Sequence, residues 1–172
     1  MERAQVCLQD HAKPGSALYL VCPCIALRRA SRAVTNLYDL VLSPTGLKAT
    51  QFITLQIIDS YGEVAQCKFA REYGRSPETL SRSLAALRAK NLLELCADPA
   101  RRERVYRLTP AGKRLLQAAT VYWNRAEARL RQVLTDEQMS LVLSLADSVT
   151  SAAHEAERLK ASNTSLAASA SI

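Results

Sequence analysis

The stretch that decides the fold is residues 75–114, RSPETLSRSLAALRAKNLLELCADPARRERVYRLTPAGKR. It contains ten Lys and Arg residues and only four acidic residues, so it carries nearly all of the formal net charge of +7. Its pattern predicts a helix, a strand, an arginine-rich loop, a second strand and the start of another helix. A basic helix followed by a basic hairpin is the electrostatic footprint of a module that grips duplex DNA.

The helix that opens this stretch is predicted to be the second helix of a helix-turn-helix. A short helix over about residues 64–72 precedes it, and a glycine turn joins the two. Ser76 can cap the second helix, and Pro77 fits its first position. Three leucines form one apolar face, and projection at about 100° per residue puts Glu78, Thr79 and Arg82 on the opposite face. This arrangement matches a DNA-binding helix-turn-helix.

Two interpretations are open for the polar face of this helix. It can enter the major groove, where Arg82 can make two hydrogen bonds to guanine, or it can be a solvated surface. The preceding turn and the following hairpin favour the first. Residues 101–107 hold four arginines in seven positions, which favours a wing that contacts the minor groove or the phosphates. The candidate DNA-binding residues are Arg75, Ser76, Glu78, Thr79, Ser81, Arg82, Arg101, Arg102 and Arg104.

The flanking helices are predicted to serve assembly. The first helix and the last two have apolar faces too broad for a compact monomer of this size to cover, which favours a symmetric homodimer. The expected fold is mainly α with a small β-hairpin wing, in which N- and C-terminal dimerisation helices flank a winged helix-turn-helix. The expected divisions are a flexible arm (1–16), a dimerisation helix (17–45), the DNA-binding domain (46–108), C-terminal dimerisation helices (109–160) and a disordered tail (161–172).

The segment Cys22-Pro23-Cys24 begins the first of these helices. A thiol at a helix N-terminus lies in a positive field that favours the thiolate, and Arg28 and Arg29 add to that field. Cys24 is therefore a candidate for oxidation to a sulfenic acid and then to a disulfide. A bridge to Cys22 across one residue would be strained, so Cys7 or a cysteine of the other subunit is the easier partner. Two alternatives stay open: both cysteines are ordinary residues near an interface, or they bind a soft metal or haem.

The other cysteines and the distribution of apolar residues predict the core and the cellular location of the protein. Cys67 and Cys96 fall on predicted apolar faces, so we expect them in the core. The chain has no run of about 18 uncharged apolar residues and no secretion signal, so we expect a cytoplasmic protein that does not contact a membrane. We expect no catalytic residues, no cofactor and no resident metal.

The basic segment resembles the winged helix of the MarR family of bacterial transcriptional regulators. The matching motifs are SPETLSRSL (76–84), NLLE (91–94) and RVYRLTPAG (104–112), and the likeness extends over about residues 20–155. It implies a homodimeric regulator, a repressor, that binds a pseudo-palindromic operator in double-stranded DNA and can take a small aromatic ligand between the dimer helices and the winged helix. The family's Asp–Arg brace in the wing is altered here, where Asp98 with Arg101 or Arg102 could replace it.

Residues 24–38 resemble the first helix of the organic-hydroperoxide-sensing branch of that family. The resemblance implies a reactive cysteine at Cys24 and a hydrogen bond from Tyr38 to that cysteine across the dimer. Fourteen helical residues separate the two positions by roughly 21 Å in one chain, so they could meet only in an antiparallel pair of helices. Where the branch has a second tyrosine, this chain has Arg28.

We therefore expect a sequence-specific regulator that cysteine oxidation or a small ligand releases from its operator. Three alternatives stay open: a ligand-responsive regulator whose cysteines have no redox role, a thiol-dependent peroxide-reducing enzyme that uses Cys24, and a non-specific architectural DNA protein. The two histidines, His11 and His154, do not suggest a paired catalytic constellation, which disfavours the enzyme. Basic charge confined to one segment disfavours the architectural protein.

Overall fold

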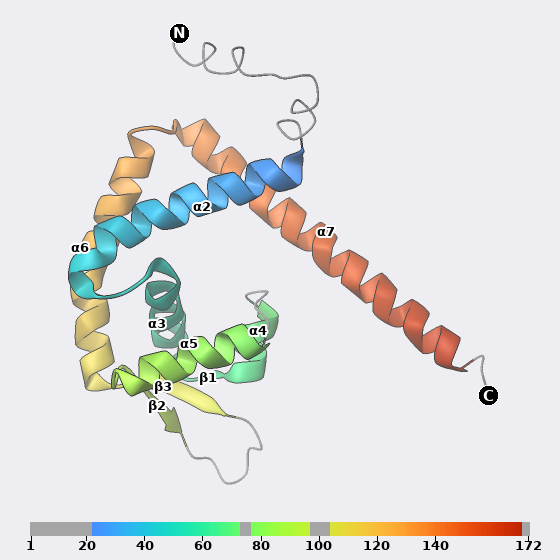
Figure 1. Cartoon of the computed structure of the whole chain (residues 1–172), viewed down its shortest axis with the longest axis horizontal. Helices are drawn as coiled ribbons and strands as arrows, with labels where there is room; N and C mark the ends of the chain where they lie inside the picture. The colour runs from blue at the N-terminus through green and yellow to red at the C-terminus, as the bar shows by residue number, and fades with distance from the viewer. Residues whose placement is uncertain (1–21, 73–76, 97–103, 170–172) are drawn as a thin grey trace, which may run out of the picture. The chain divides into compact units, whose positions relative to one another are not determined.

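The computed structural model describes residues 22–72, 77–96 and 104–169, so the predicted arm at 1–16 lies outside it. The chain divides after Ala126 into two units, and each is described by itself. Helices and one small sheet make up the described chain (Figure 1), which confirms the predicted fold class. The elements are α2 (Pro23–Leu42), the 3-10 turn η2 (Ser43–Thr45), α3 (Ala49–Tyr61), β1 (Val64–Ala65), α4 (Gln66–Glu72), α5 (Pro77–Ala89), β2 (Leu93–Cys96), β3 (Val105–Leu108), α6 (Pro110–Arg131) and α7 (Asp136–Ser169).

The sheet has three antiparallel strands in the order β1-β3-β2. The β2–β3 hairpin was predicted, whereas β1 was not: the helix expected from residue 64 begins at Gln66. The physical reason is length, because a strand of two residues is too short to show a period in the sequence. Val64 is opposite Tyr106, and the Gln66 amide donates to the carbonyl of Arg104 at 3.0 Å.

The core of the first unit lies between α3, α4, α5 and the sheet. Burial of each large apolar side chain there contributes about 1.5–3 kcal/mol. In α5 the leucines at positions 80, 84 and 87 are fully buried, as their spacing predicted. The largest fully buried apolar side chains are Leu42, Phe52, Leu55, Ile58, Phe69, Leu80, Leu84 and Leu87.

An aromatic cluster joins three helices of this unit. The single tryptophan, Trp123 of α6, stacks on Phe52 of α3 with ring centroids 4.4 Å apart, and Tyr38 of α2 lies tilted against it at 4.4 Å. Asp39 of α2 also accepts a hydrogen bond from the first amide of α3, that of Ala49, at 2.7 Å. The C-terminal turns of α2 are thereby fixed to the domain.

The end of α5 and the start of α6 meet in one junction. Asn91 adopts a left-handed conformation (φ 58°), and hydrogen bonds from Leu92 to Leu87 and from Asn91 to Arg88 close α5 in a Schellman motif. Thr109 donates its hydroxyl to the Asn91 carbonyl at 2.7 Å and accepts from the Gly112 amide at 2.9 Å, so it caps α6. The Leu92 carbonyl accepts from the Thr109 amide at 3.1 Å.

The second unit is dominated by α7. A capping box begins this helix: the Thr135 amide donates to the Gln138 side chain at 2.9 Å, and the Gln138 amide donates to the Thr135 hydroxyl at 3.2 Å. The helix continues to Ser169, so the tail predicted to be disordered over 161–172 is helical over 161–169. No glycine or proline interrupts the sequence after residue 136, and alanine, the best helix former, is frequent there. None of the helices within the described ranges is long and apolar enough to cross a membrane.

A substitution at Gly112 tests the junction, because a Cβ at this position would overlap the carbonyl oxygen and carbon of Leu92. Alanine in place of glycine in an open helix gains about 1 kcal/mol. Here we expect Gly112→Ala to lower the free energy of unfolding by about 1–3 kcal/mol, since the backbone of Leu92 must move. Urea unfolding followed by the fluorescence of Trp123 measures the change.

The control is Ala118→Gly at an exposed position of the same helix, where the change should cost about 1 kcal/mol through helix propensity alone. An increase in stability on Gly112→Ala would show that the close approach does not exist.

Candidate nucleic-acid interface

The fully buried leucines of α5 place its opposite side at the surface. Glu78, Thr79 and Arg82 are exposed there, whereas Ser81 is half-buried at the edge of that face. The Nε of Arg82 lies 3.5 Å from the carbonyl of Glu78, one turn earlier, so the side chain extends along the first turns of the helix. The N-terminal half of α5 therefore presents a polar surface with a guanidinium at its centre.

The hairpin carries a second exposed cation of the domain. Arg104 precedes β3, and its carbonyl is fixed by the amide of Gln66 while its side chain is exposed. Figure 1 shows the strands β2 and β3 on the same part of the domain as α5, and β2 packs against that helix. Arg82 and Arg104 are thus exposed on two neighbouring parts of one domain.

Arg107 forms an ion pair within the hairpin. It faces Glu94 across the hairpin, and its Nε donates to the Glu94 carboxylate at 2.6 Å. This hydrogen bond, together with the charge of Glu94, raises the pKa of the guanidinium. Arg107 therefore has a partner in its own hairpin, and a contact between Arg107 and DNA stays a prediction.

Five of the nine candidate DNA-binding residues are described: Glu78, Thr79, Ser81, Arg82 and Arg104. The other four, and Asp98, lie outside the described residues.

One further candidate DNA-binding residue, Lys68, was missed by the sequence analysis because it lies outside the basic stretch. The ammonium of Lys68 on α4 lies 4.9 Å from the centre of the Tyr61 ring, which is itself exposed. In a helix-turn-helix the first helix crosses the DNA backbone, so Lys68 is placed on the relevant element.

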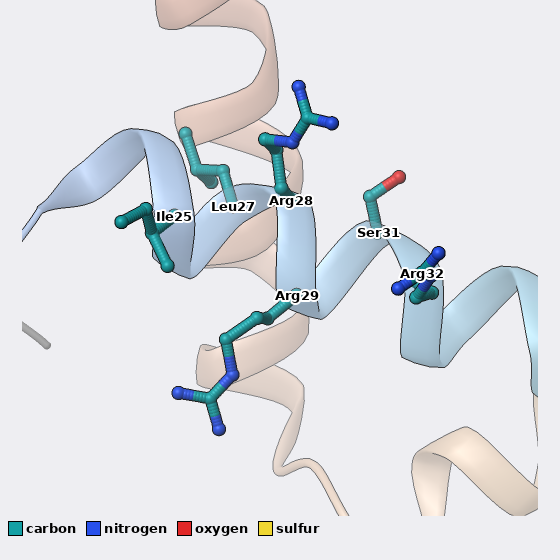
Figure 2. Close-up of a pocket in the computed structure, with 6 residues that line it drawn as sticks. All are labelled: Ile25, Leu27, Arg28, Arg29, Ser31 and Arg32. Carbon is teal, nitrogen blue, oxygen red and sulfur yellow. The ribbon is translucent and has the colours of Figure 1, made fainter. Parts of the chain in front are cut away.

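The N-terminal turns of α2 form a separate surface. Cys22 is the residue before the helix and is half-buried, and Cys24 in the first turn is exposed. Figure 2 shows Arg28 and Arg29 extending from different sides of this segment. Tyr38, near the other end of α2, is only 6% exposed and packs on Trp123 in its own chain. The hydrogen bond predicted between Tyr38 and a partner's Cys24 stays a prediction.

Cys96, the last residue of β2 before the loop of the hairpin, differs from Cys24. It is half-buried rather than in the core, and its thiol donates to the Glu63 carboxylate at 3.7 Å. Burial, and then the negative charge of Glu63, raises the pKa of the Cys96 thiol. The side chain of Cys67 is not described. In the described ranges no three His, Cys, Asp or Glu side chains gather as a metal site would require.

The sequence as a whole matches no family model and no curated protein. Solved structures do match: the transcriptional regulator MosR of M. tuberculosis in complex with DNA is 29% identical, with a TM-score of 0.67 over 76% of this chain and 97% of that one. A MarR-family transcriptional regulator from Rhodococcus sp. RHA1 is 25% identical, with a TM-score of 0.62 over 74% and 89%. The repressor CouR bound to p-coumaroyl-CoA is 23% identical and shares the fold, with a TM-score of 0.72 over 81% and 98%.

The described elements, two short helices followed by a hairpin on a leucine core, define a winged helix protein. The similar structures are transcriptional regulators of one family, and they are covered almost completely by this chain. The chain therefore shares the winged helix fold of these MarR-family transcriptional regulators, as its motifs predicted.

Cys24 and Cys96 should differ in reactivity toward an alkylating reagent. At neutral pH we expect iodoacetamide to alkylate Cys24 at least about 10-fold faster than Cys96, because Cys24 is exposed while burial and Glu63 disfavour the Cys96 thiolate. Peptide mapping by mass spectrometry at successive times gives the two rates. Equal rates would show that the half-buried position of Cys96 does not protect it.

Proposed function

We propose that this protein is a homodimeric, sequence-specific DNA-binding regulator that represses transcription and leaves its operator when an effector acts on it. The observation that carries the proposal is the surface of α5, where Glu78, Thr79 and Arg82 are exposed on the side opposite a fully buried leucine face. The DNA complexes of MosR and of other similar regulators support it.

The geometry suits a mode of binding in which α5 reads the base edges and the hairpin anchors the protein on the phosphates. The N-terminal residues of a recognition helix contact base edges, and Arg82 stands in the second turn of α5. An arginine there can bind guanine through two hydrogen bonds. Arg104, with Arg101 and Arg102, would neutralise phosphates at the wing, and Lys68 would do so beside α4.

Uncovered apolar surface supports the dimer. In α7, Leu141 is 67% exposed and Leu143 is 62% exposed, and Leu27 and Val34 of α2 are also exposed. A second copy related by a two-fold axis would cover such helices and would place two α5 helices about 34 Å apart, on successive turns of a pseudo-palindromic operator.

Cys24 is the proposed effector site for an oxidant. Its thiolate would attack a peroxide oxygen, the O–O bond would break, and the products would be the Cys24 sulfenic acid and water or an alcohol. Within the described ranges no histidine or carboxylate is hydrogen-bonded to Cys24, so we propose a sensor that reacts once rather than an enzyme that turns over. A small aromatic ligand is the second candidate effector, because CouR, which shares this fold, binds p-coumaroyl-CoA.

The role of Arg82 can be measured on an operator selected from genomic fragments. Arg82→Ala should weaken operator binding roughly 10- to 100-fold, because a bidentate arginine–guanine contact contributes about 1–3 kcal/mol of base discrimination. Fluorescence anisotropy at fixed salt gives the affinity.

The matched control is Arg88→Ala, which removes the same charge from an exposed position in the last turn of the same helix. It should weaken operator and unrelated DNA equally and only slightly. Equal losses for the two variants on the operator would mean that Arg82 contributes charge alone and does not read sequence.

The redox proposal concerns release from DNA. Peroxide should dissociate the wild-type protein from its operator, whereas Cys24→Ser should stay bound, because a hydroxyl cannot form a sulfenic acid. Cys96→Ser should respond like the wild type, since the pKa of the Cys96 thiol is raised. The measurement is operator-bound fraction against peroxide concentration. Release of Cys24→Ser at wild-type peroxide concentrations would remove Cys24 as the sensor.

A further inference from the structure

The turn that joins α2 to α3, residues 43–48, holds the carbonyl end of α2 in a defined shape. The Thr45 hydroxyl donates to the Leu42 carbonyl at 2.7 Å, and the Gly46 amide donates to the Ser43 carbonyl at 3.1 Å. Gly46 has a left-handed backbone (φ 70°), a conformation that glycine adopts without strain. We call residues 43–48 the α2–α3 turn.

The positive charge at this end of α2 comes from another helix. The carbonyl end of a helix favours a cation, because its last carbonyl groups lack amide partners within the helix. Neither the last turn of α2 nor η2 contains a basic residue. Instead the ammonium of Lys90, the residue after α5, donates to the Gly46 carbonyl at 3.2 Å, across 44 residues of sequence. Lysine side chains commonly cap the carbonyls at a helix C-terminus, and here the cap is supplied by α5.

Both partners of this hydrogen bond are fixed to their own segments. The Lys90 amide donates to the Ala86 carbonyl at 3.3 Å, and the two amides that follow close the Schellman motif of α5. In the α2–α3 turn Leu47 is buried, and Asp39 holds the first amide of α3 and the Lys48 ammonium. Figure 1 shows the end of α5 and this turn on the same side of the domain. A hydrogen bond between two fixed segments restrains their orientation.

We propose that Lys90 is a positioning residue for DNA binding, which holds the end of α5 against the α2–α3 turn and thereby fixes the angle between α5 and α2. The inference rests on the proposed sequence-specific homodimer and adds to it a residue that acts through α5. Lys90 lies about 18 Å along the helix from Glu78 in the first turn. A tilt of about 10° at this end would move the first turn by about 3 Å, close to one base-pair step of about 3.4 Å.

The consequence is control over the spacing of operator half-sites. Exposed apolar side chains of α2 belong to the surface that we propose a second copy covers, so the angle between α5 and α2 also sets the separation of the two α5 helices. Half-site spacing in an operator mirrors that separation. Lys90 should therefore affect which spacing the dimer accepts. A lysine that binds a phosphate would instead affect all DNA sequences alike.

The test compares three variants of the full chain, Lys90→Met, Lys90→Arg and Arg88→Met. Methionine keeps the unbranched apolar part of the lysine side chain and removes the donor, whereas arginine keeps a donor and the charge. Arg88→Met removes the same charge two residues earlier, from an exposed side chain that has no hydrogen bond or ion pair among the described residues. The duplexes are the operator selected from genomic fragments, the same operator with one base pair inserted between its half-sites, and an unrelated sequence.

Lys90→Met should bind the operator roughly 3- to 10-fold more weakly than the wild type, because one intramolecular hydrogen bond contributes about that factor. Its preference for the operator over the duplex with the inserted base pair should fall by a similar factor. Its affinity for the unrelated duplex, and the slope of affinity against salt concentration, should stay at the wild-type values. Lys90→Arg should restore the preference, and Arg88→Met should keep it. Without DNA, NMR hydrogen exchange should find the Gly46 amide faster in Lys90→Met than in Arg88→Met.

Two outcomes would overturn the role of Lys90 and leave the proposed function standing. A salt slope that is smaller by about 1 in Lys90→Met, with equal losses on the operator and the unrelated duplex, would make Lys90 a phosphate contact. An unchanged spacing preference in Lys90→Met, or a wild type that accepts the inserted base pair equally well, would show that the hydrogen bond does not set the spacing. A wild type with the same affinity for all three duplexes would instead refute the proposed sequence-specific regulator, and this inference with it.

Discussion

The junction between the end of α5 and the start of α6 is the constraint on which the rest of the domain depends. Three features meet there: the left-handed turn at Asn91, the Leu92 carbonyl and the Thr109 side-chain cap. Gly112 lets the first turn of α6 approach Leu92 without a side chain in between. Since β2 begins one residue after Leu92, the junction sets the direction of the hairpin relative to α5.

This junction also explains why the sequence was informative. The motif at 91–94 and the motif ending at Gly112 were recognised separately, and in the structure they touch. Local signals, such as the leucine spacing of α5, predicted elements because their physics is contained within a few residues. The cap that Asp39 places on α3 was not predictable in this way, because donor and acceptor are ten residues apart and join different helices.

Counting charged residues does not show which group each of them faces, whereas the spacing of apolar residues does show which face of an element is buried. The sequence shows that Arg107 is basic, but only the register of the hairpin shows that it faces Glu94. Counting also hid a pattern: outside residues 75–114 the chain is close to neutral, yet residues 22–38 hold three arginines and no acid, and residues 136–157 hold five acids and no Lys or Arg. A small net charge can therefore conceal two segments of opposite charge.

The proposed sensor and the proposed dimer contact share one piece of backbone. Cys24 lies in the exposed turns of α2 that carry the arginines, whereas the other end of α2 is fixed by the aromatic cluster and by Asp39. In the proposed homodimer, oxidation would act on the exposed half of the helix, where a new polar group or covalent bond would change how α2 meets a second copy. The fixed half would carry that change to α3, and so alter the spacing of the two α5 helices. Coupling of this kind requires a rigid connection between the two surfaces, and the stacking of Trp123 on Phe52 provides one.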